Sequence, residues 1–145
     1  MNIKEKLLKI QSELKAPKSQ YNNFGKYAYR SCEDILTAFK PLGVEYKATL
    51  FITDGIELIG DRYYVKATAT LADTESDEVI GVSAYAREEE NKKGQDSSQT
   101  TGSTSSYARK YALNGLLAID DTKDSDATNM HGTEAKTVVK AKAKA

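Results

Sequence analysis

The stretch Arg62-Tyr-Tyr-Val-Lys-Ala-Thr-Ala-Thr-Leu71 indicates the fold class of this chain. Its apolar and polar residues alternate, which is typical of a β-strand with one buried face and one solvated face. Similar alternation runs from Val44 to Thr53 and from Val79 to Arg87. Because the connections are short, the three segments predict an antiparallel meander. The Asp54-Gly55 pair predicts the position of the first hairpin turn.

Helical spacing near the N-terminus predicts a first helix. Its apolar positions are Ile3, Leu7, Ile10 and Leu14. This apolar stripe is narrow, so we expect one edge of the helix to pack on the body while the rest stays in water. Pro17 follows and opposes continuation of the helix.

A second, short helix is expected after Ser31. Ser31 and Asp34 have the spacing of a capping box, in which each side chain bonds the backbone N–H of the other residue. Pro41 and Gly43 are expected to stop this helix. Its apolar residues are Ile35, Leu36 and Phe39.

The main helix is expected from Ser103 to Ile119, after a polar, mobile loop from Glu88 to Thr101. One apolar stripe consists of Ala108, Tyr111, Ala112, Gly115 and Ile119, and Leu113 and Leu117 point elsewhere. A helix that is apolar on several sides is usually buried on several sides, here against the sheet or against another subunit. The predicted fold is α+β: N-terminal helices, a three-stranded antiparallel meander, and a long helix.

The chain of 145 residues fits one domain, predicted at 1–126, and a tail at 127–145. The tail is rich in lysine and alanine and is expected to be disordered, because it cannot bury enough apolar surface to order itself. The 21 basic and 21 acidic residues cancel. Any nucleic-acid site must therefore be a local patch. The acidic stretch before the tail and the basic tail itself are expected to be minor for function.

Several classes of protein are not expected. Apolar runs such as Leu116–Ile119 are far shorter than the ~20 residues that span a bilayer. The N-terminus does not resemble a secretory signal, so a cytoplasmic protein is expected. Cys32 is the single cysteine, which leaves neither an internal disulfide nor a zinc set, and we expect no cofactor. A P-loop ATPase is excluded because its phosphate-binding motif is absent.

A first functional segment runs from Phe24 to Arg30, with Tyr21 just before it. It interleaves Lys26 and Arg30 with three aromatic residues, and Gly25 permits close backbone approach. Proteins hold single-stranded nucleic acid with cations on the phosphates and aromatic faces under the bases. The alternative is that these aromatic residues fill the bottom of the core.

A second functional segment runs from Gly102 to Leu113. Glycine and hydroxyl side chains at a helix start would leave backbone N–H groups free to bind a phosphate. Arg109 and Lys110 lie one to two turns further on and would extend that site. The alternative is that Ser105 and Ser106 only cap the helix, with both cations facing water.

The second segment resembles the signature of the ERF superfamily of phage recombination proteins. The matching residues are Gly102, Ser106, Tyr107, Lys110 and Tyr111. The family pattern has arginine where this chain has Lys110, which keeps the charge and loses the bidentate geometry. The segment from Phe24 to Ser31 and the helix end from Asn114 to Asp121 are also similar to the family, so the resemblance covers about residues 1–126.

The resemblance implies a non-enzymatic protein that binds single-stranded DNA and anneals complementary strands without ATP. It also implies a β-β-β-α core and assembly of identical subunits into rings or filaments. The implied role is in phage recombination and DNA repair in the host cytoplasm. A host exchange protein or single-strand-binding protein is an implied partner. The candidate DNA contacts are Lys26, Tyr27, Tyr29, Arg30, Arg62, Lys66, Arg87, Lys92, Lys93, Arg109 and Lys110. A neutral chain would need several subunits to pool such small patches in one groove.

Two other readings remain open. Glu88–Glu90 with Lys92, or Asp120 with Asp121, carry the groups of a metal-dependent nuclease. No pattern places two of these carboxylates at a shared site. The second is a protein-interaction module without DNA affinity, which would dock through the first helix.

Overall fold

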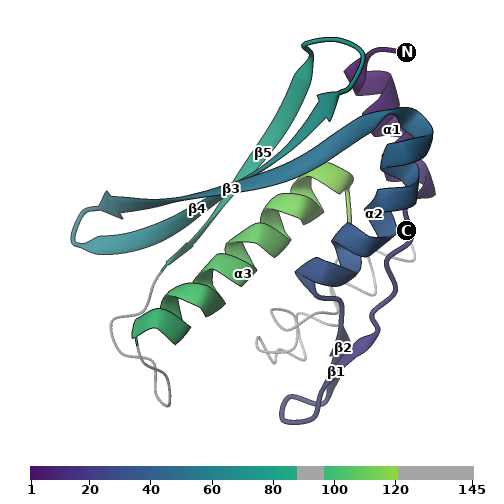
Figure 1. Ribbon diagram of the computed structural model, residues 1–145. Coiled ribbons are helices and arrows are strands. Elements are labelled where there is room, and N and C mark those ends of the chain that lie inside the picture. The colour runs from purple at the N-terminus through teal and green to yellow at the C-terminus, as the bar shows by residue number, and fades with distance from the viewer. Residues whose placement is uncertain (88–96, 121–145) are drawn as a thin grey trace, which may run out of the picture.

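The computed structural model describes residues 1–87 and 97–120 (Figure 1). Strands β3 (Ala48–Ile59), β4 (Arg62–Asp73) and β5 (Val79–Arg87) form an antiparallel sheet in the order β3-β4-β5. The predicted meander is therefore confirmed. Helix α3 (Ser97–Leu117) crosses one face of this sheet.

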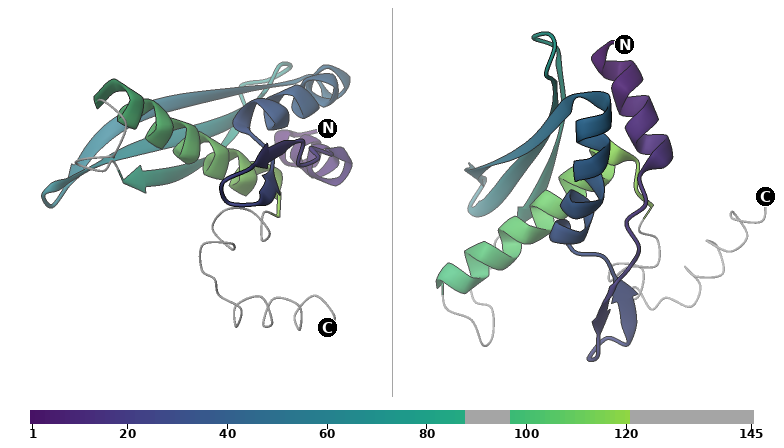
Figure 2. Two further views of the ribbon diagram at one scale, coloured as in Figure 1. Left: turned by 90° about the horizontal axis from the view of Figure 1, so that it is seen from below. Right: turned by 45° about the vertical axis from the view of Figure 1, so that its right-hand side comes forward.

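The remaining elements gather at the end of the sheet where α3 finishes. Helices α1 (Ile3–Glu13) and α2 (Cys32–Tyr46) pack there beside each other. Between them in sequence, β1 (Gln20–Asn22) and β2 (Tyr27–Tyr29) form a small antiparallel hairpin. The right-hand view of Figure 2 shows this hairpin projecting away from the sheet.

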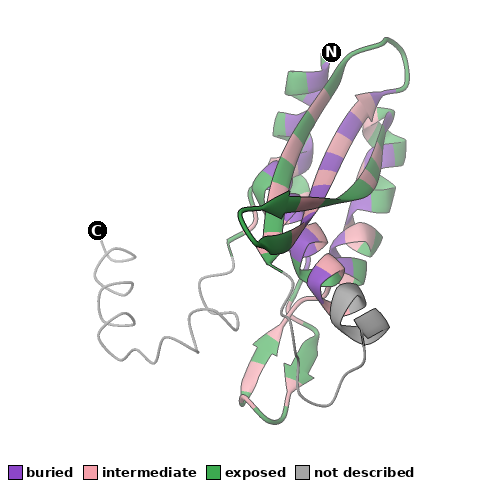
Figure 3. Ribbon diagram, turned by 90° about the vertical axis from the view of Figure 1, so that its left-hand side faces the viewer, coloured by how far each residue is buried: buried purple, intermediate pink, exposed green. Residues whose placement is uncertain are grey.

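The core lies between the sheet and the helices. On β4, Val65, Ala67, Ala69 and Leu71 are at most 1% exposed, and they alternate with partly exposed residues (Figure 3). Ala108 and Ala112 of α3 belong to the same buried cluster. Small side chains on both elements let the helix approach the sheet closely, and a Cβ on Gly115 would lie 3.0 Å from Val82 Cγ1. Leu113, Leu116 and Leu117 of α3 are also at most 1% exposed, so the apolar residues of the helix are buried on more than one side.

The first hairpin turn lies further along the chain than expected. Asp54 and Gly55 are paired inside β3, opposite Ala67 and Lys66. The turn is made by Gly60 and Asp61, and Gly60 has the left-handed φ of +64° that glycine adopts readily. Gly-Asp is itself a two-residue turn signal, so two signals compete in this stretch.

Helix α2 is longer than its proline suggested. It continues through Pro41 to Tyr46, and Lys47 ends it in the left-handed region at φ 56°. The strand therefore begins at Ala48 and not at Val44. Tight packing explains the extension: a Cβ on Gly43 would lie 2.7 Å from the Phe39 ring and 2.8 Å from the Ala48 carbonyl. Because the helix does continue, the packing around it offsets the hydrogen bond that Pro41 cannot donate and the crowding of its ring.

Helix α3 also begins earlier than expected. It starts at Ser97, so residues 97–101 are helical and the predicted loop is wrong for them. The rest of that loop, 88–96, lies outside the described residues. The helix ends at Leu117, two residues before Ile119, because Ala118 turns the chain with a left-handed φ of 56°.

Helix α1 contains Ile3, Leu7 and Ile10 of the predicted apolar stripe. The fourth residue, Leu14, is the C-cap that directly follows the helix. The same helix buries Lys6, which is only 3% exposed. The Lys6 ammonium donates to Asp73 Oδ1 at 2.7 Å and to Glu75 Oε1 at 2.9 Å. The hydrogen bond from Lys6 lowers the pKa of Asp73 to about 2. This ion cluster attaches α1 to the turn between β4 and β5.

Candidate nucleic-acid interface

The tip of the β1–β2 hairpin is held by one asparagine. Asn22 Oδ1 accepts a hydrogen bond from the Gly25 N–H at 2.8 Å, and its carbonyl accepts one from the Lys26 N–H at 2.7 Å. Lys26 adopts φ 60°, the left-handed conformation that closes the turn. The Tyr27 ring covers Gly25 so closely that a Cβ there would lie 2.4 Å from Tyr27 Cε1. Gly25 thus leaves room for the Tyr27 ring, and the expected close approach of a ligand to its backbone stays a prediction.

The aromatic residues of this hairpin do not fill the core. Phe24 is 99% exposed and Tyr21 is 56% exposed. Tyr27 and Tyr29 are partly buried, with ring centroids 5.9 Å apart. The core alternative for this segment is therefore wrong.

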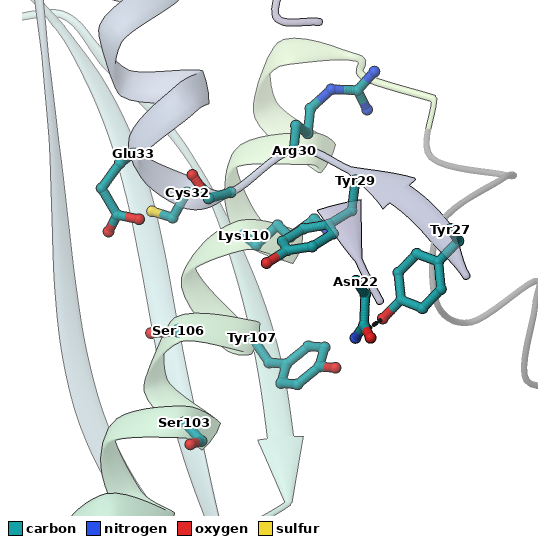
Figure 4. Close-up of a pocket in the computed structure, with 11 residues that line it drawn as sticks. Asn22, Tyr27, Tyr29, Arg30, Cys32, Glu33, Ser103, Ser106, Tyr107 and Lys110 are labelled. Atoms are coloured by element: carbon teal, nitrogen blue, oxygen red, sulfur yellow. Dashed lines mark hydrogen bonds between the residues drawn. The ribbon is translucent and has the colours of Figure 1, made fainter. Parts of the chain in front are cut away.

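A pocket of about 330 Å³ opens where the hairpin faces α3 and the start of α2 (Figure 4). We call it the hairpin pocket. It brings together the two segments that the sequence singled out, which are far apart along the chain. Its lining residues are Asn22, Tyr27, Tyr29, Arg30, Ser31, Cys32, Glu33, Ser103, Ser106, Tyr107 and Lys110.

One face of α3 lines this pocket. Ser103, Ser106, Tyr107 and Lys110 follow the i, i+3, i+4, i+7 spacing of one helix face. Tyr107 is 43% exposed and stacks on Tyr111, with centroids 6.1 Å apart and planes at 18°. Three of the five motif residues therefore line the pocket, and Tyr111 supports one of them from outside it.

Lys110 of α3 contacts the hairpin through an aromatic ring. It is 8% exposed, and its ammonium lies 5.7 Å from the centroid of the Tyr29 ring. A cation over an aromatic face is attracted by the ring quadrupole. This contact joins α3 to β2, so the motif lysine positions an aromatic wall of the pocket.

Arg30 lies at the other side of the pocket and is anchored through carbonyl groups. Its Nε donates to the Ala16 carbonyl at 2.6 Å and its Nη1 to the Asp120 carbonyl at 3.5 Å. Figure 4 shows its guanidinium directed away from the rings of the pocket, toward the residues that follow α1 and α3. Arg30 therefore lines the pocket while its charged end lies outside it.

The expected phosphate site at the start of α3 is wrong. Gly102 and Ser103 lie beyond the first turn of the helix that begins at Ser97. Only the first four N–H groups of a helix lack partners inside it. Helix capping by Ser105 and Ser106 is wrong for the same reason.

Arg109 points to a different part of the molecule from Lys110. Its Nε lies 3.1 Å from both carboxylate oxygens of Asp54 on β3. The Ser105 hydroxyl donates to the same carboxylate at 2.5 Å. These contacts hold α3 to the sheet. They also satisfy the carboxylate of Asp54, the residue that the sequence had placed in a hairpin turn.

The cations of the sheet form a second surface. Arg62 and Lys66 alternate with the buried residues of β4, and Arg87 of β5 pairs with Tyr64, so all three lie on the face opposite α3. We call this the outer sheet face. Lys66 lies 5.8 Å from the Tyr85 ring centroid and 3.8 Å from Glu57. Of the other candidate contacts, Tyr27, Tyr29, Arg30 and Lys110 line the hairpin pocket, whereas Lys26 at the hairpin tip and Arg109 belong to neither surface. Lys92 and Lys93 lie outside the described residues.

Sequence reasoning missed several pocket residues. Asn22 donates to the Tyr27 hydroxyl at 3.1 Å, and Cys32 and Glu33 begin α2 at the pocket wall. Burial raises the pKa of the Cys32 thiol, so the cysteine favours its neutral form. No pattern marks these residues, because their roles depend on where the hairpin folds.

Other kinds of site can be considered only for the described part of the chain. Among residues 1–87 and 97–120, no three His, Cys, Asp or Glu residues lie close enough to hold a metal ion. No helix in these two ranges is both long and apolar enough to cross a membrane. Glu88–Glu90, Lys92 and Asp121, which the nuclease alternative requires, lie outside the described residues, as does the predicted tail.

Comparison with known proteins identifies relatives by sequence. The chain is 64% identical over 122 residues to the "Essential recombination function protein" of Salmonella phage P22. The match covers 83% of this chain and 57% of the phage protein, so the chain spans little more than half of its relative's length. No solved structure matches the chain. The model of the ERF superfamily matches residues 3–145, and the chain therefore belongs to the ERF superfamily.

Proposed function

We propose that this protein acts in phage recombination, where it binds single-stranded DNA and anneals complementary strands without ATP. The name of the phage P22 relative, "Essential recombination function protein", supports the recombination role. The hairpin pocket supports the chemistry. Tyr27, Tyr29 and Tyr107 supply aromatic faces at one concave site, which Lys110 also lines.

The meeting of the two sequence segments in one pocket is the observation that carries this proposal. Aromatic rings and cations in a groove bind single strands with little dependence on sequence, because every base has a stacking face and every nucleotide has a phosphate. The pocket volume of about 330 Å³ is small, and we propose that it takes one or two bases of a single strand. Strand recognition by stacking leaves the Watson–Crick edges of the bases open to a complement.

The charge balance of the chain sets a condition on this function. With 21 basic and 21 acidic residues, one protomer offers few phosphate contacts. We propose that identical subunits assemble along the strand and repeat the hairpin pocket, so that small contributions add. Annealing then draws its free energy from base pairing, and the protein needs no nucleotide hydrolysis.

The test combines a binding assay with an annealing assay. We expect the purified protein to bind a labelled oligonucleotide and to accelerate pairing of complementary strands with no ATP present. Tyr29→Ala should lower the affinity for single strands roughly 5- to 100-fold, which corresponds to the loss of one stacked base. Tyr63→Ala is the matched control, because Tyr63 is 55% exposed and lies on β4, outside the pocket.

The outcomes separate the possible functions. Absence of binding to any single strand at low salt would contradict the proposal and favour a protein-interaction module. Cleavage of the oligonucleotide on addition of Mg²⁺ would indicate a nuclease. A protein that stays monomeric on the strand and leaves the annealing rate unchanged would contradict the assembly step.

A further inference from the structure

The tip of the β1–β2 hairpin exposes a large apolar side chain that the pocket does not use. Phe24 is 99% exposed, the highest value among the exposed large hydrophobic residues of the described chain. It lies on the loop between Asn22 and Tyr27, which points away from the sheet (Figure 2). Full exposure forgoes the free energy that burial of a phenyl ring provides. The ring is therefore fully available for contact with a ligand.

Hydrogen bonds define the backbone that carries this ring. The two hydrogen bonds to Asn22 and the left-handed Lys26 define the backbone on both sides of Phe24. The hydrogen bond from Asn22 to the Tyr27 hydroxyl links the loop to the wall of the hairpin pocket. Phe24 is therefore carried on the same small hairpin as two aromatic residues of the pocket.

The surroundings of Phe24 indicate what it meets. Docking to another protein usually uses a continuous apolar patch. The immediate neighbours of Phe24 are Asn23, Gly25 and Lys26, which are polar or lack a side chain. An apolar ring on a loop that also carries a lysine suits insertion between two stacked bases, and the lysine could contact a phosphate of the same strand.

We propose that Phe24 is a wedge that inserts between neighbouring bases of the bound strand and breaks their stacking beside the hairpin pocket. This inference rests on the proposed function and adds to it. Each protomer would interrupt the base stack once, so the bound strand would be divided into short stacked runs. Bases held in this way cannot stack continuously or fold back on the same strand, and they stay available to a complement.

The chain has no tryptophan, which allows a direct test. Phe24→Trp places the only indole of the protein at the hairpin tip. We expect its emission to be quenched when single-stranded DNA is added, because stacking on a base quenches indole fluorescence. Tyr63→Trp places an indole at a site of 55% exposure outside the pocket, and its emission should not change.

A second measurement follows the DNA. An oligonucleotide that carries 2-aminopurine becomes brighter when this base loses its stacked neighbours. We expect the wild-type protein and Phe24→Tyr to increase the emission, and Phe24→Ala to abolish the increase. Phe24→Ala should also lower the affinity roughly 5- to 100-fold and leave the salt dependence unchanged, because stacking releases no counterions.

The outcomes distinguish this inference from the proposed function. If anisotropy shows binding while the Phe24→Trp variant is not quenched and Phe24→Ala still brightens 2-aminopurine, the wedge is wrong and DNA binding stands. If the emission of Phe24→Trp shifts with protein concentration in the absence of DNA, another copy of the chain covers the tip and the wedge is wrong. If the wild-type protein binds no single strand, the proposed function fails and the wedge with it.

Discussion

Two surfaces of this protein place cations beside tyrosines, and they are built in different ways. The hairpin pocket takes its residues from the β1–β2 hairpin, the start of α2 and one face of α3. The outer sheet face takes Lys66, Tyr85 and Arg87 from two neighbouring strands. Tyr107 in the pocket and Tyr85 on the sheet are 43% and 48% exposed. The two tyrosines are thus nearly equally exposed, so the exposure of the rings does not distinguish the two surfaces.

The difference shows what a DNA site needs beyond composition. In the pocket, rings from separate elements face a common space, so a strand could contact several of them at once. On the outer sheet face, Lys66 lies between the Tyr85 ring and the Glu57 carboxylate, and its charge is partly offset. The hairpin pocket is therefore the proposed binding site, and the outer sheet face serves as the comparison.

The largest expected effect is on stability, and it tests whether α3 uses different residues for the core and for the pocket. Leu113 is fully buried, whereas Tyr107 faces the pocket on the same helix. We expect Leu113→Ala to reduce the free energy of unfolding by about 2–5 kcal/mol, since it leaves a cavity in the core. Tyr107→Ala should change stability far less. Urea denaturation measures both, and equal losses would mean that the pocket face of α3 is part of the core.

The sheet could be predicted from sequence because its pattern is local. The alternation from Arg62 to Leu71 reflects one face packed on α3, and β4 and β5 lie where the pattern indicates. The turn before β4 could not be predicted in this way. Asp54 carries a turn signal, but it is retained in β3 and its carboxylate bonds Arg109 and Ser105 of α3, far away in sequence.

The predicted end of α2 was wrong for a similar reason. Pro41 is a local stop signal, yet the packing of Gly43 against Phe39 and Ala48 favours continuation of α2. Local signals therefore predict an element, and contacts between elements decide where it ends.

The candidate site was predictable in its parts and not in its assembly. Residue types alone singled out the aromatic hairpin segment and the motif of α3. Their meeting depends on the angle at which α3 crosses the sheet and on the contact between Lys110 and Tyr29. No sequence pattern encodes that distance, and Asn22 carries neither the charge nor the ring that would have marked it.

The next largest effect compares the two tyrosines directly. We expect Tyr107→Ala to lower the affinity for single-stranded DNA roughly 5- to 100-fold, because it removes one stacking surface. Tyr85→Ala should leave the affinity unchanged. Fluorescence anisotropy with one oligonucleotide measures both variants at fixed salt. An equal loss for both would show that the strand contacts the outer sheet face as well, and the comparison would fail.

A smaller effect concerns the charges and is visible in the salt dependence. Lys26→Asn removes the ammonium at the hairpin tip, and asparagine tolerates the left-handed φ of 60° found there. If Lys26 contacts one phosphate, the slope of log affinity against log salt should become shallower by about 0.7. Lys66→Asn on the outer sheet face should leave that slope unchanged. The opposite result for the two lysines would place the phosphates on the sheet.

The smallest effect concerns Arg109, which lies within the family motif but outside the pocket. Its guanidinium is engaged by Asp54, and both side chains are partly exposed to solvent. An exposed pair of this kind contributes about 0.2–1 kcal/mol to stability. We expect a double-mutant cycle of Arg109→Ala and Asp54→Asn to give a coupling energy of that size in urea denaturation. Neither substitution should alter DNA affinity, because Arg109 holds α3 to β3 while Lys110 supports the pocket. A flatter salt dependence for Arg109→Ala would mean that a phosphate competes with Asp54 for this arginine, and that the bound strand extends from the hairpin pocket to the edge of the sheet.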